Sequence, residues 1–168
     1  MEFQELIRRR YSVREYRPEP VSEEALALIL EAGRLAPTAA NRQPFRIVVL
    51  HGAGRQEALG RVYARAWFQQ APVVLCVCGV PGEAWVRKDG RSHMDVDAAI
   101  VMDHVILAAT DEGLGTCWIA NFDVDAARAV FELRPGEVPL LLTTLGRAAD
   151  RPGPKQRRGL ESLVRRVR

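Results

Sequence analysis

The residues best suited to chemistry begin near the N-terminus, where Arg10 and Arg14 flank Tyr11 and Ser12. A guanidinium group can donate two parallel hydrogen bonds to phosphate oxygens, and a hydroxyl can donate one more. This spacing therefore predicts a site for a phosphate monoester. Taken alone, the same arginines also fit a solvated helix end, so the prediction needs support from elsewhere in the chain.

The tail carries a second basic motif, the pair Lys155 and Arg157. Arg8, Arg9 and Arg158 have no such second motif to support them. We expect these three arginines to be ordinary surface charges.

A third candidate motif lies in a segment rich in turn-forming residues. Its candidate ligand-binding residues are Pro37, Thr38, Ala39, Asn41 and Gln43. Amide side chains carry both donors and acceptors, so they can pair with a ligand that presents both. Pro, Thr and Asn are also common in plain turns, and this alternative interpretation stays open.

The segment Gly113–Ile119 places two glycines at a helix end and continues as a short apolar run. In residue type and order, this segment and the three motifs above resemble the nitroreductase family of FMN-dependent oxidoreductases. The resemblance implies that Arg10, Tyr11, Ser12 and Arg14 hold the phosphate and ribityl chain of FMN. It also implies that Lys155 and Arg157 reach the phosphate from the tail, so that polar groups from the two chain ends converge on one dianion. It covers almost the full chain.

The resemblance also assigns roles around the flavin ring. It implies that the loop 37–43 comes from the partner subunit and lies along the isoalloxazine ring. It further implies that the backbone of Trp118, Ile119, Ala120 and Asn121 passes the flavin N5 edge, where an N–H group stabilises the reduced ring. The family more often has Ser in the first half of the loop and Gly where Ala120 stands. For Trp118, a core position on a strand is the alternative interpretation.

For the whole molecule, the resemblance implies an α+β fold of three layers, with a central, mostly antiparallel sheet flanked by helices. It implies a homodimer with two FMN sites at the interface, and a C-terminal extension over residues 147–168 that wraps the partner subunit. The rest of the chain belongs to the same single domain, residues 1–168.

The implied activity is NAD(P)H-dependent reduction of nitroaromatics, quinones or related electron-poor acceptors, by ping-pong hydride transfer through flavin N5. The flavin carries this chemistry, so no side chain is predicted to be catalytic. Alternatives within the fold are an enone reductase, a flavin-consuming enzyme or a dehalogenase, although a dehalogenase needs a longer lid than residues 80–92 supply. A non-catalytic flavin-binding or nucleic-acid-binding module is the alternative from another class.

These motifs must be positioned by a layered set of strands and helices. Apolar, β-branched runs predict strands over residues 45–50, 73–78 and 138–145, with a shorter one over 116–120. The run 73–78 is almost continuously apolar, which is typical of a strand covered on both faces. Strands separated by helices favour an α/β or α+β fold, and the pattern alone leaves the strand order open.

Apolar residues at helical spacing predict the helices. One ends near Arg10, one begins after Ser22 as N-cap, one covers residues 55–69, and one runs from about His93 to Glu112 and is apolar almost all round. A short helix follows the N-cap residue Asp123. The irregular stretch 80–92 predicts a loop over a pocket.

Composition narrows the class of protein. With 168 residues, 48% of them hydrophobic, the chain can bury one domain core. Charges interrupt its first residues and no long uncharged run follows, so we expect a cytoplasmic protein without a membrane partner. Its three cysteines lie in apolar runs and predict buried thiols, and the His and Cys spacing predicts no metal site.

The positive charge is concentrated in the tail. Residues 147–168 contain eight Lys and Arg residues against two acidic residues, although the formal net charge of the whole chain is only +3. A basic tail can bind nucleic acid, but no aromatic residue lies among these charges and no groove-reading motif is present. We therefore expect a phosphate-bearing small molecule, and not nucleic acid, as the anionic partner.

Overall fold

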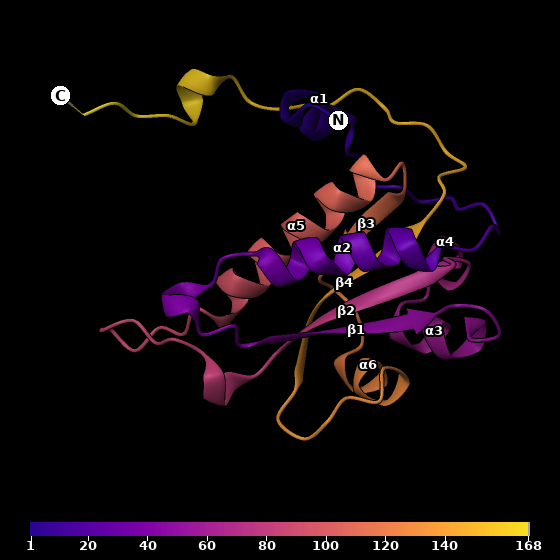
Figure 1. Ribbon diagram of the computed structural model, residues 1–168, viewed down its shortest axis with the longest axis horizontal. Helices are drawn as coiled ribbons and strands as arrows, with labels where there is room; N and C mark the ends of the chain where they lie inside the picture. Colours follow the sequence, from indigo (N-terminus) through magenta and orange to yellow (C-terminus); the bar gives the residue numbers. More distant parts are fainter. Residues whose placement is uncertain (168) are drawn as a thin grey trace.

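The computed structural model describes residues 1–167, and in this range four strands form one sheet between two layers of helices (Figure 1). The strands are β1 (Phe45–His51), β2 (Val73–Gly79), β3 (Gly115–Ile119) and β4 (Val138–Gly146). Their spatial order is β1-β2-β4-β3, and all three neighbouring pairs are antiparallel. The predicted α+β fold with an antiparallel sheet is confirmed.

Helices cover both faces of this sheet, as Figure 1 shows. One face carries α2 (Glu23–Leu35) and α5 (Met94–Asp111), and the other carries α3 (Gln56–Val62), α4 (Ala66–Gln69) and α6 (Val124–Val130). The helix α1 (Phe3–Arg9) packs against α5. Short 3₁₀ turns lie at Ala39–Asn41, Pro81–Glu83 and Leu160–Ser162.

Strand β2 lies at the centre of the core. All seven of its residues are buried, because side chains that alternate along a strand face two different helical layers. Val73 and Leu75 pack with α2 and α5, whereas Val74 and Cys76 pack with α3, α4 and α6. The predicted strand covered on both faces is therefore confirmed.

The helix ends follow the predicted capping residues. The Ser22 hydroxyl accepts a hydrogen bond from the Ala25 amide (3.3 Å), and the Asp123 carboxylate accepts one from the Ala126 amide (2.8 Å). Gly113, with φ at 71°, ends α5 in the left-handed conformation that favours glycine.

The single helix predicted over residues 55–69 is wrong, because the segment forms two helices. Tyr63 breaks it with extended backbone (φ −151°, ψ 110°), and the freed Val62 carbonyl accepts the Asp123 amide (2.9 Å). The break lets Phe68 turn into the core, where its side chain is fully buried and its ring lies perpendicular to the rings of Tyr63 and Trp67. Tertiary packing overrides the helical pattern here.

The N-terminal segment is held against the edge strand β3. Ser12 forms a parallel bridge with Thr116, and the Val13 amide donates to the Thr116 carbonyl (2.9 Å). Val13 is fully buried, and Gly115 is required beneath it because a Cβ there would lie 2.4 Å from the Val13 side chain. Since side chains alternate, Ser12 and Arg14 face away from the core on either side of Val13.

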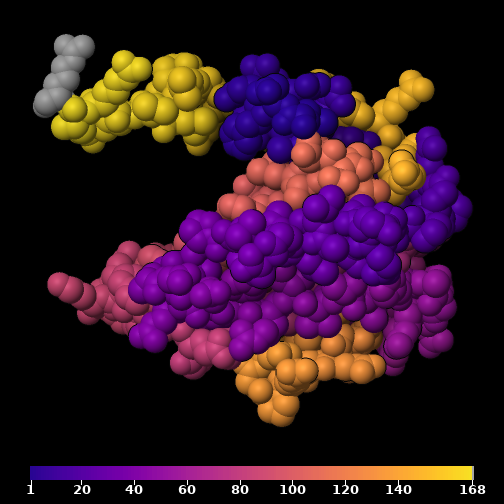
Figure 2. Space-filling view, viewed as in Figure 1, coloured from indigo at the N-terminus to yellow at the C-terminus, as the bar shows by residue number. Residues whose placement is uncertain are grey.

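The chain after β4 runs beside this N-terminal segment. The Arg17 amide donates to the Arg147 carbonyl (2.9 Å), and the Ala149 amide donates to the Glu15 carbonyl (2.8 Å). Beyond residue 150 the tail passes α1 and leaves the body of the molecule (Figure 2). The two ends of the chain therefore meet before the tail projects away.

Candidate functional site

A basic pocket of about 480 Å³ lies where the two ends of the chain meet. Its lining includes all six site residues predicted from those ends, namely Arg10, Tyr11, Ser12, Arg14, Lys155 and Arg157. The N-terminal residues are placed by their bridge to β3, and the tail residues by the pairing of residues 147–149 with the N-terminal segment. The predicted meeting of the two ends is present in a single chain.

The basic pocket contains cations that lack acidic partners. None of the ion pairs within residues 1–167 involves Arg10, Arg14, Lys155 or Arg157. Desolvation, followed by the charges of Arg10 and Arg157, lowers the pKa of the Lys155 ammonium. Bringing these cations together therefore has an electrostatic cost, which a bound dianion would offset.

Asp150 organises the wall of the basic pocket without neutralising its arginine side chains. One carboxylate oxygen accepts the Tyr11 hydroxyl (3.1 Å) and the other accepts the backbone amide of Arg14 (2.8 Å). Partial burial and this hydrogen bond raise the pKa of Tyr11 to about 12. Tyr11 is therefore a neutral donor that ties the N-terminal segment to the start of the tail.

Lys155 connects the tail to helix α1. Its ammonium donates to the Ile7 carbonyl (2.9 Å) and to the Arg8 carbonyl, both in the last turn of α1. A cation is favoured there because the helix end presents unpaired carbonyl groups. The same ammonium therefore holds α1 in place and adds positive charge to the basic pocket.

A second hollow of about 220 Å³ shares Arg14 with the basic pocket. Four predicted residues line it, namely Trp118, Ile119, Ala120 and Asn121. Trp118 is 37% exposed, so its interpretation as a core aromatic is wrong. The Ile119 side chain is 5% exposed and lies in the core, which leaves its backbone as the part facing the hollow.

The loop from Pro37 to Gln43, called the polar loop below, lies elsewhere. It precedes β1, at one edge of the sheet, whereas Ser12 bridges to β3 at the other edge. Along the direction of the strands, Phe45 and Thr116 also lie at opposite ends of the sheet. Strand spacings place the polar loop roughly 20 Å or more from the basic pocket. One chain thus brings ten of the fifteen predicted residues together and leaves five apart.

The polar loop has an unusual backbone. Ala40, Asn41 and Gln43 have φ angles of 50°, 52° and 53°, in the left-handed region that non-glycine residues seldom adopt. The Thr38 hydroxyl accepts the Gln43 amide (3.0 Å), and this bond closes the loop. The side chains of Asn41 and Gln43 are exposed. Such clustered strain is typical of functional sites rather than plain turns.

Sequence reasoning missed two acidic residues that position these segments. Asp97 accepts the Ala39 amide (2.8 Å), and its spacing from the buried Val101 and Val105 could have shown that it faces the core. Asp150 has no comparable signal, because no periodic pattern surrounds it. Each acid contacts a backbone amide distant in sequence, which single-sequence patterns do not encode.

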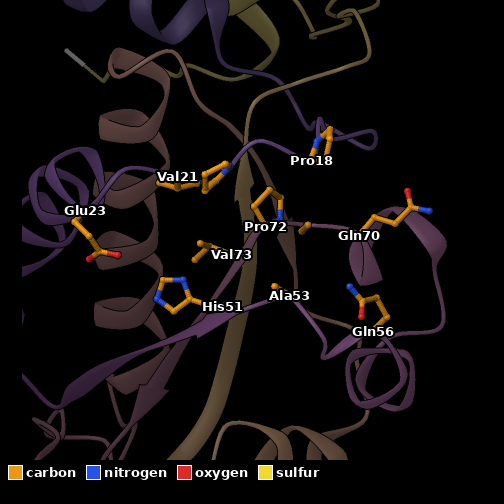
Figure 3. A pocket seen from close by; sticks show the side chains of 12 residues that line it. Pro18, Val21, Glu23, His51, Ala53, Gln56, Gln70, Pro72 and Val73 are labelled. Atoms are coloured by element: carbon orange, nitrogen blue, oxygen red, sulfur yellow. The ribbon is translucent and has the colours of Figure 1, made fainter.

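Another hollow, of about 370 Å³, lies near the ends of β1 and β2. Figure 3 shows His51 and Glu23 on one side of it and Gln56 and Gln70 on the other. Its lining contains none of the predicted site residues. We therefore leave it outside the candidate site.

Two classes of feature are absent from the part of the chain that the structure describes. Residues 1–167 contain no group of three or more His, Cys, Asp or Glu side chains that could hold a metal ion. Within the same range, no helix combines the length and apolar character needed to span a membrane.

A four-stranded antiparallel sheet between two helical layers defines an α+β protein of three layers. The family model described as "Nitroreductase family" matches residues 7–72 and 55–147, so the chain belongs to the nitroreductase family. The predicted resemblance is confirmed, and with it the prediction that the protein is an enzyme of this family.

Individual relatives agree with this assignment. A nitroreductase family protein from Clostridium difficile 630 shares 34% sequence identity, covers 98% of each chain and superimposes with a TM-score of 0.89. A Thermus thermophilus protein named NADH dehydrogenase is 29% identical over 187 residues, 93% of this chain and 91% of its own. A Desulfovibrio desulfuricans protein crystallised in complex with FMN is 26% identical, covers 99% and 97% of the two chains, and has a TM-score of 0.83.

Proposed function

We propose that residues 1–168 form a single FMN-binding domain that uses NAD(P)H to reduce nitroaromatics, quinones or related electron-poor acceptors. The observation that carries this proposal is the basic pocket, in which cations from both chain ends lie together without acidic partners. Family membership and the FMN bound by the Desulfovibrio relative support it.

The residues present fit the phosphate end of FMN. Arg10, Arg14, Lys155 and Arg157 supply positive charge, and Ser12 supplies a hydroxyl donor at the same pocket. Desolvation and, after it, repulsion from Arg10 and Arg157 lower the pKa of Lys155, and a phosphate dianion would relieve this repulsion. The charge of the donor set therefore matches the charge of the ligand.

The neighbouring hollow fits the ring end. Trp118, Ala120 and Asn121 are exposed and line a space that shares Arg14 with the basic pocket. Side chains there can flank a planar ring, and backbone N–H groups can stabilise negative charge on it. When bound, FMN supplies the chemistry by taking a hydride at N5 from NAD(P)H and passing it to the acceptor in a ping-pong cycle. The chain's own residues bind and orient the ring, and we assign none of them a catalytic role.

We also propose a homodimer in which each FMN site combines the basic pocket of one protomer with the polar loop of its partner. The polar loop carries exposed amide side chains and has no part in its own chain's basic pocket. The tail beyond residue 157 exposes Leu160, Leu163 and Val164 by 72%, 54% and 49%. Apolar side chains exposed on an extended segment favour burial against a second copy.

The function is tested with the purified protein. We expect flavin absorbance after incubation with FMN and gel filtration, and anaerobic bleaching when NADH or NADPH is added. A ranking of acceptors by their rate of reoxidising the reduced protein then separates nitroaromatics and quinones from enones. A protein that takes up no FMN contradicts the proposal, as does one whose bound flavin is not reduced by either nicotinamide.

The shared site is tested by co-expressing differently tagged chains. Arg14→Ala disables the basic pocket and Asn41→Ala/Gln43→Ala disables the polar loop. If sites are shared, a heterodimer of these two variants keeps one intact site and binds FMN at half stoichiometry. A second heterodimer joins the wild-type chain to a chain that carries all three substitutions. Each of its two sites then contains one defect, so neither site binds FMN. The reverse pattern would show that each chain builds its own site.

A further inference from the structure

We propose that Asp97 is a positioning residue for the cofactor site, acting through the polar loop. This inference rests on the proposed function, because it assigns the polar loop a part in binding FMN. Asp97 lies in the first turn of α5 and is 1% exposed. One of its carboxylate oxygens accepts the backbone amide of Ala39 at 2.8 Å.

Burying the Asp97 carboxylate is energetically unfavourable, and formation of α5 does not require a carboxylate at this position. The second oxygen, Oδ2, is buried and has no hydrogen-bond partner among residues 1–167. Burying a polar group without a partner is unfavourable, and an alanine would satisfy the buried helix face as Ala98 does. The bond to Ala39 is therefore the contribution of Asp97 that offsets this cost.

The polar loop needs such an anchor because its conformation is strained. Ala40, Asn41 and Gln43 all have left-handed backbone, and such residues persist only where the surroundings hold them. The far side of the loop is fixed where the Val80 amide donates to the Pro44 carbonyl (2.9 Å). Asp97 fixes the near side, immediately before the first left-handed residue.

Together these two anchors determine where the exposed amides of Asn41 and Gln43 point. The side chain of Gln43 also donates to the backbone carbonyl of Asn41 (3.2 Å), which links the two residues. Loss of the Asp97 anchor would leave the loop attached but free to sample ordinary right-handed backbone. We infer that Asp97 preorganises the loop for the flavin and does not itself touch it.

A purely structural role for Asp97 would be to place negative charge near the N-terminus of α5. Asp95 provides a matched control, because it lies in the same helical turn, is exposed and makes no hydrogen bond to the polar loop within the described residues. Asp95→Ala changes the charge at the helix end by the same amount and leaves the anchor intact.

The experiment compares Asp97→Ala, Asp97→Asn and Asp95→Ala as full-length proteins. Backbone hydrogen exchange of residues 39–43 is measured without FMN, and FMN affinity is measured by quenching of flavin fluorescence. We expect Asp97→Ala to speed exchange and to weaken FMN binding about tenfold. Asp97→Asn keeps an acceptor oxygen, so it should restore binding to within about threefold. Asp95→Ala should match wild type in both measurements.

A second variant covers the case in which Asp97→Ala fails to fold. Ala39→Pro removes the donor from the other side of the bond, and Thr38 has the extended backbone (φ −131°, ψ 158°) that a following proline requires. We expect it to weaken FMN binding as Asp97→Ala does, and the double variant to lose no more than either single one.

Several outcomes overturn the proposal. Wild-type FMN affinity in both Asp97→Ala and Ala39→Pro would show that the bond has no part in the cofactor site, even if exchange were faster. Equal losses in Asp97→Asn and Asp97→Ala would show that packing or charge, and not the acceptor, is what the loop needs. If the wild-type chain itself binds no FMN, the proposed function fails, and unchanged exchange in Asp97→Ala would show separately that the anchor is absent.

Discussion

The basic pocket and the polar loop are built by different physical means. The basic pocket is a set of exposed or half-buried cationic side chains that one chain assembles by joining its two ends. The polar loop has little charge, a strained backbone and an anchor in the buried core. We propose that the first recognises a ligand by its charge, and the second by the directions in which amide groups are held.

The two regions therefore differ in how precisely they must be positioned to bind FMN. Charge attraction tolerates small displacements, so the basic pocket can sit on long side chains and an extended tail. Hydrogen bonds to a ring edge weaken steeply with angle, so the polar loop must be held rigidly. We therefore expect substitutions in the basic pocket to change FMN retention most. Substitutions that alter the backbone of the polar loop but keep its amide side chains should have smaller and more conformational effects.

The largest effect is expected for the double variant Arg14→Ala/Arg157→Ala. Charged hydrogen bonds contribute about 1.5–3 kcal/mol each, so the loss of two should weaken FMN binding at least about a hundredfold. The fold should persist, because both side chains are exposed and form none of the ion pairs found within the described residues. Titration with FMN and a thermal melt measure the two quantities.

The matched control removes two arginines from the same regions of sequence. Arg8→Ala/Arg158→Ala changes the net charge equally, but neither residue lines the basic pocket. If the control loses as much FMN as the test variant, general positive charge and not the pocket geometry binds the phosphate.

The second-largest effect is expected for a truncation that removes the exposed apolar residues of the tail and keeps the basic pocket. A chain truncated after Arg157 keeps the whole basic pocket but loses Leu160, Leu163 and Val164. Burying an apolar side chain contributes about 1.5–3 kcal/mol, so loss of even two such contacts should weaken dimerisation by about a hundredfold or more. Sedimentation velocity across a concentration series measures this.

Arg165→Ala/Arg166→Ala is the control for the truncation, since it removes charge from the tail and leaves the apolar residues. Its dimerisation should match that of the wild-type chain. A truncated protein that dimerises normally would contradict the proposed contact between the tail and a second copy.

Local features of the fold could be predicted from the sequence because short-range physics determines them. Ser22 and Asp123 were identifiable as N-caps, and Gly113 as a helix stop, since each acts on neighbours only a few residues away. The buried strand 73–78 was identifiable by composition. The break at Tyr63 was not, because it depends on contacts with α6 and the core.

The candidate site likewise contains residues that could be predicted from the sequence and residues that could not. The residues near both ends were predicted through the family resemblance, and the structure places them together in the basic pocket. Strand order, which separates the polar loop from that pocket, depends on pairing between distant segments. The anchors Asp97 and Asp150 were missed for the same reason, because each acts on an amide more than fifty residues away.

A smaller effect tests the strain in the polar loop. Ala40→Gly relieves a left-handed conformation that costs about 1–2 kcal/mol and adds about 0.5–1 kcal/mol of backbone entropy to be lost on folding. We expect a net gain of up to about 1 kcal/mol in the free energy of unfolding, measured by urea denaturation. FMN affinity should fall slightly because the loop is less preorganised.

Ala27→Gly is the matched control for this change. Ala27 is exposed within α2, where glycine is unfavourable by about 1 kcal/mol. The two Ala→Gly variants should therefore shift stability in opposite directions. A loss of stability at both sites would show that the left-handed backbone at Ala40 is not strained.

The smallest effect concerns pH, which should change the contribution of Tyr11 at the basic pocket but not the strain in the polar loop. Tyr11 has a pKa of about 12 in the folded chain, against 10 for an ordinary tyrosine, because it is partly buried and donates to Asp150. Between pH 10 and 12 the unfolded chain releases this proton first, so rising pH favours unfolding. The stability that the Tyr11 hydroxyl contributes is fully present below pH 10 and is lost as the pH rises through 12.

Burial also raises the pKa of Tyr16, so the wild-type chain loses stability in alkali for two reasons. Tyr11→Phe should leave a shallower decline between pH 10 and 12, measured by denaturation at a series of pH values. The gain from Ala40→Gly should be equal at pH 7 and pH 11, because backbone strain involves no proton. If instead Tyr11→Phe declines as steeply as wild type, Asp150 does not hold Tyr11 in its neutral form. The two chain ends are then joined by backbone pairing, by the bond from the Arg14 amide to Asp150 and by Lys155, without a contribution from the Tyr11 hydroxyl.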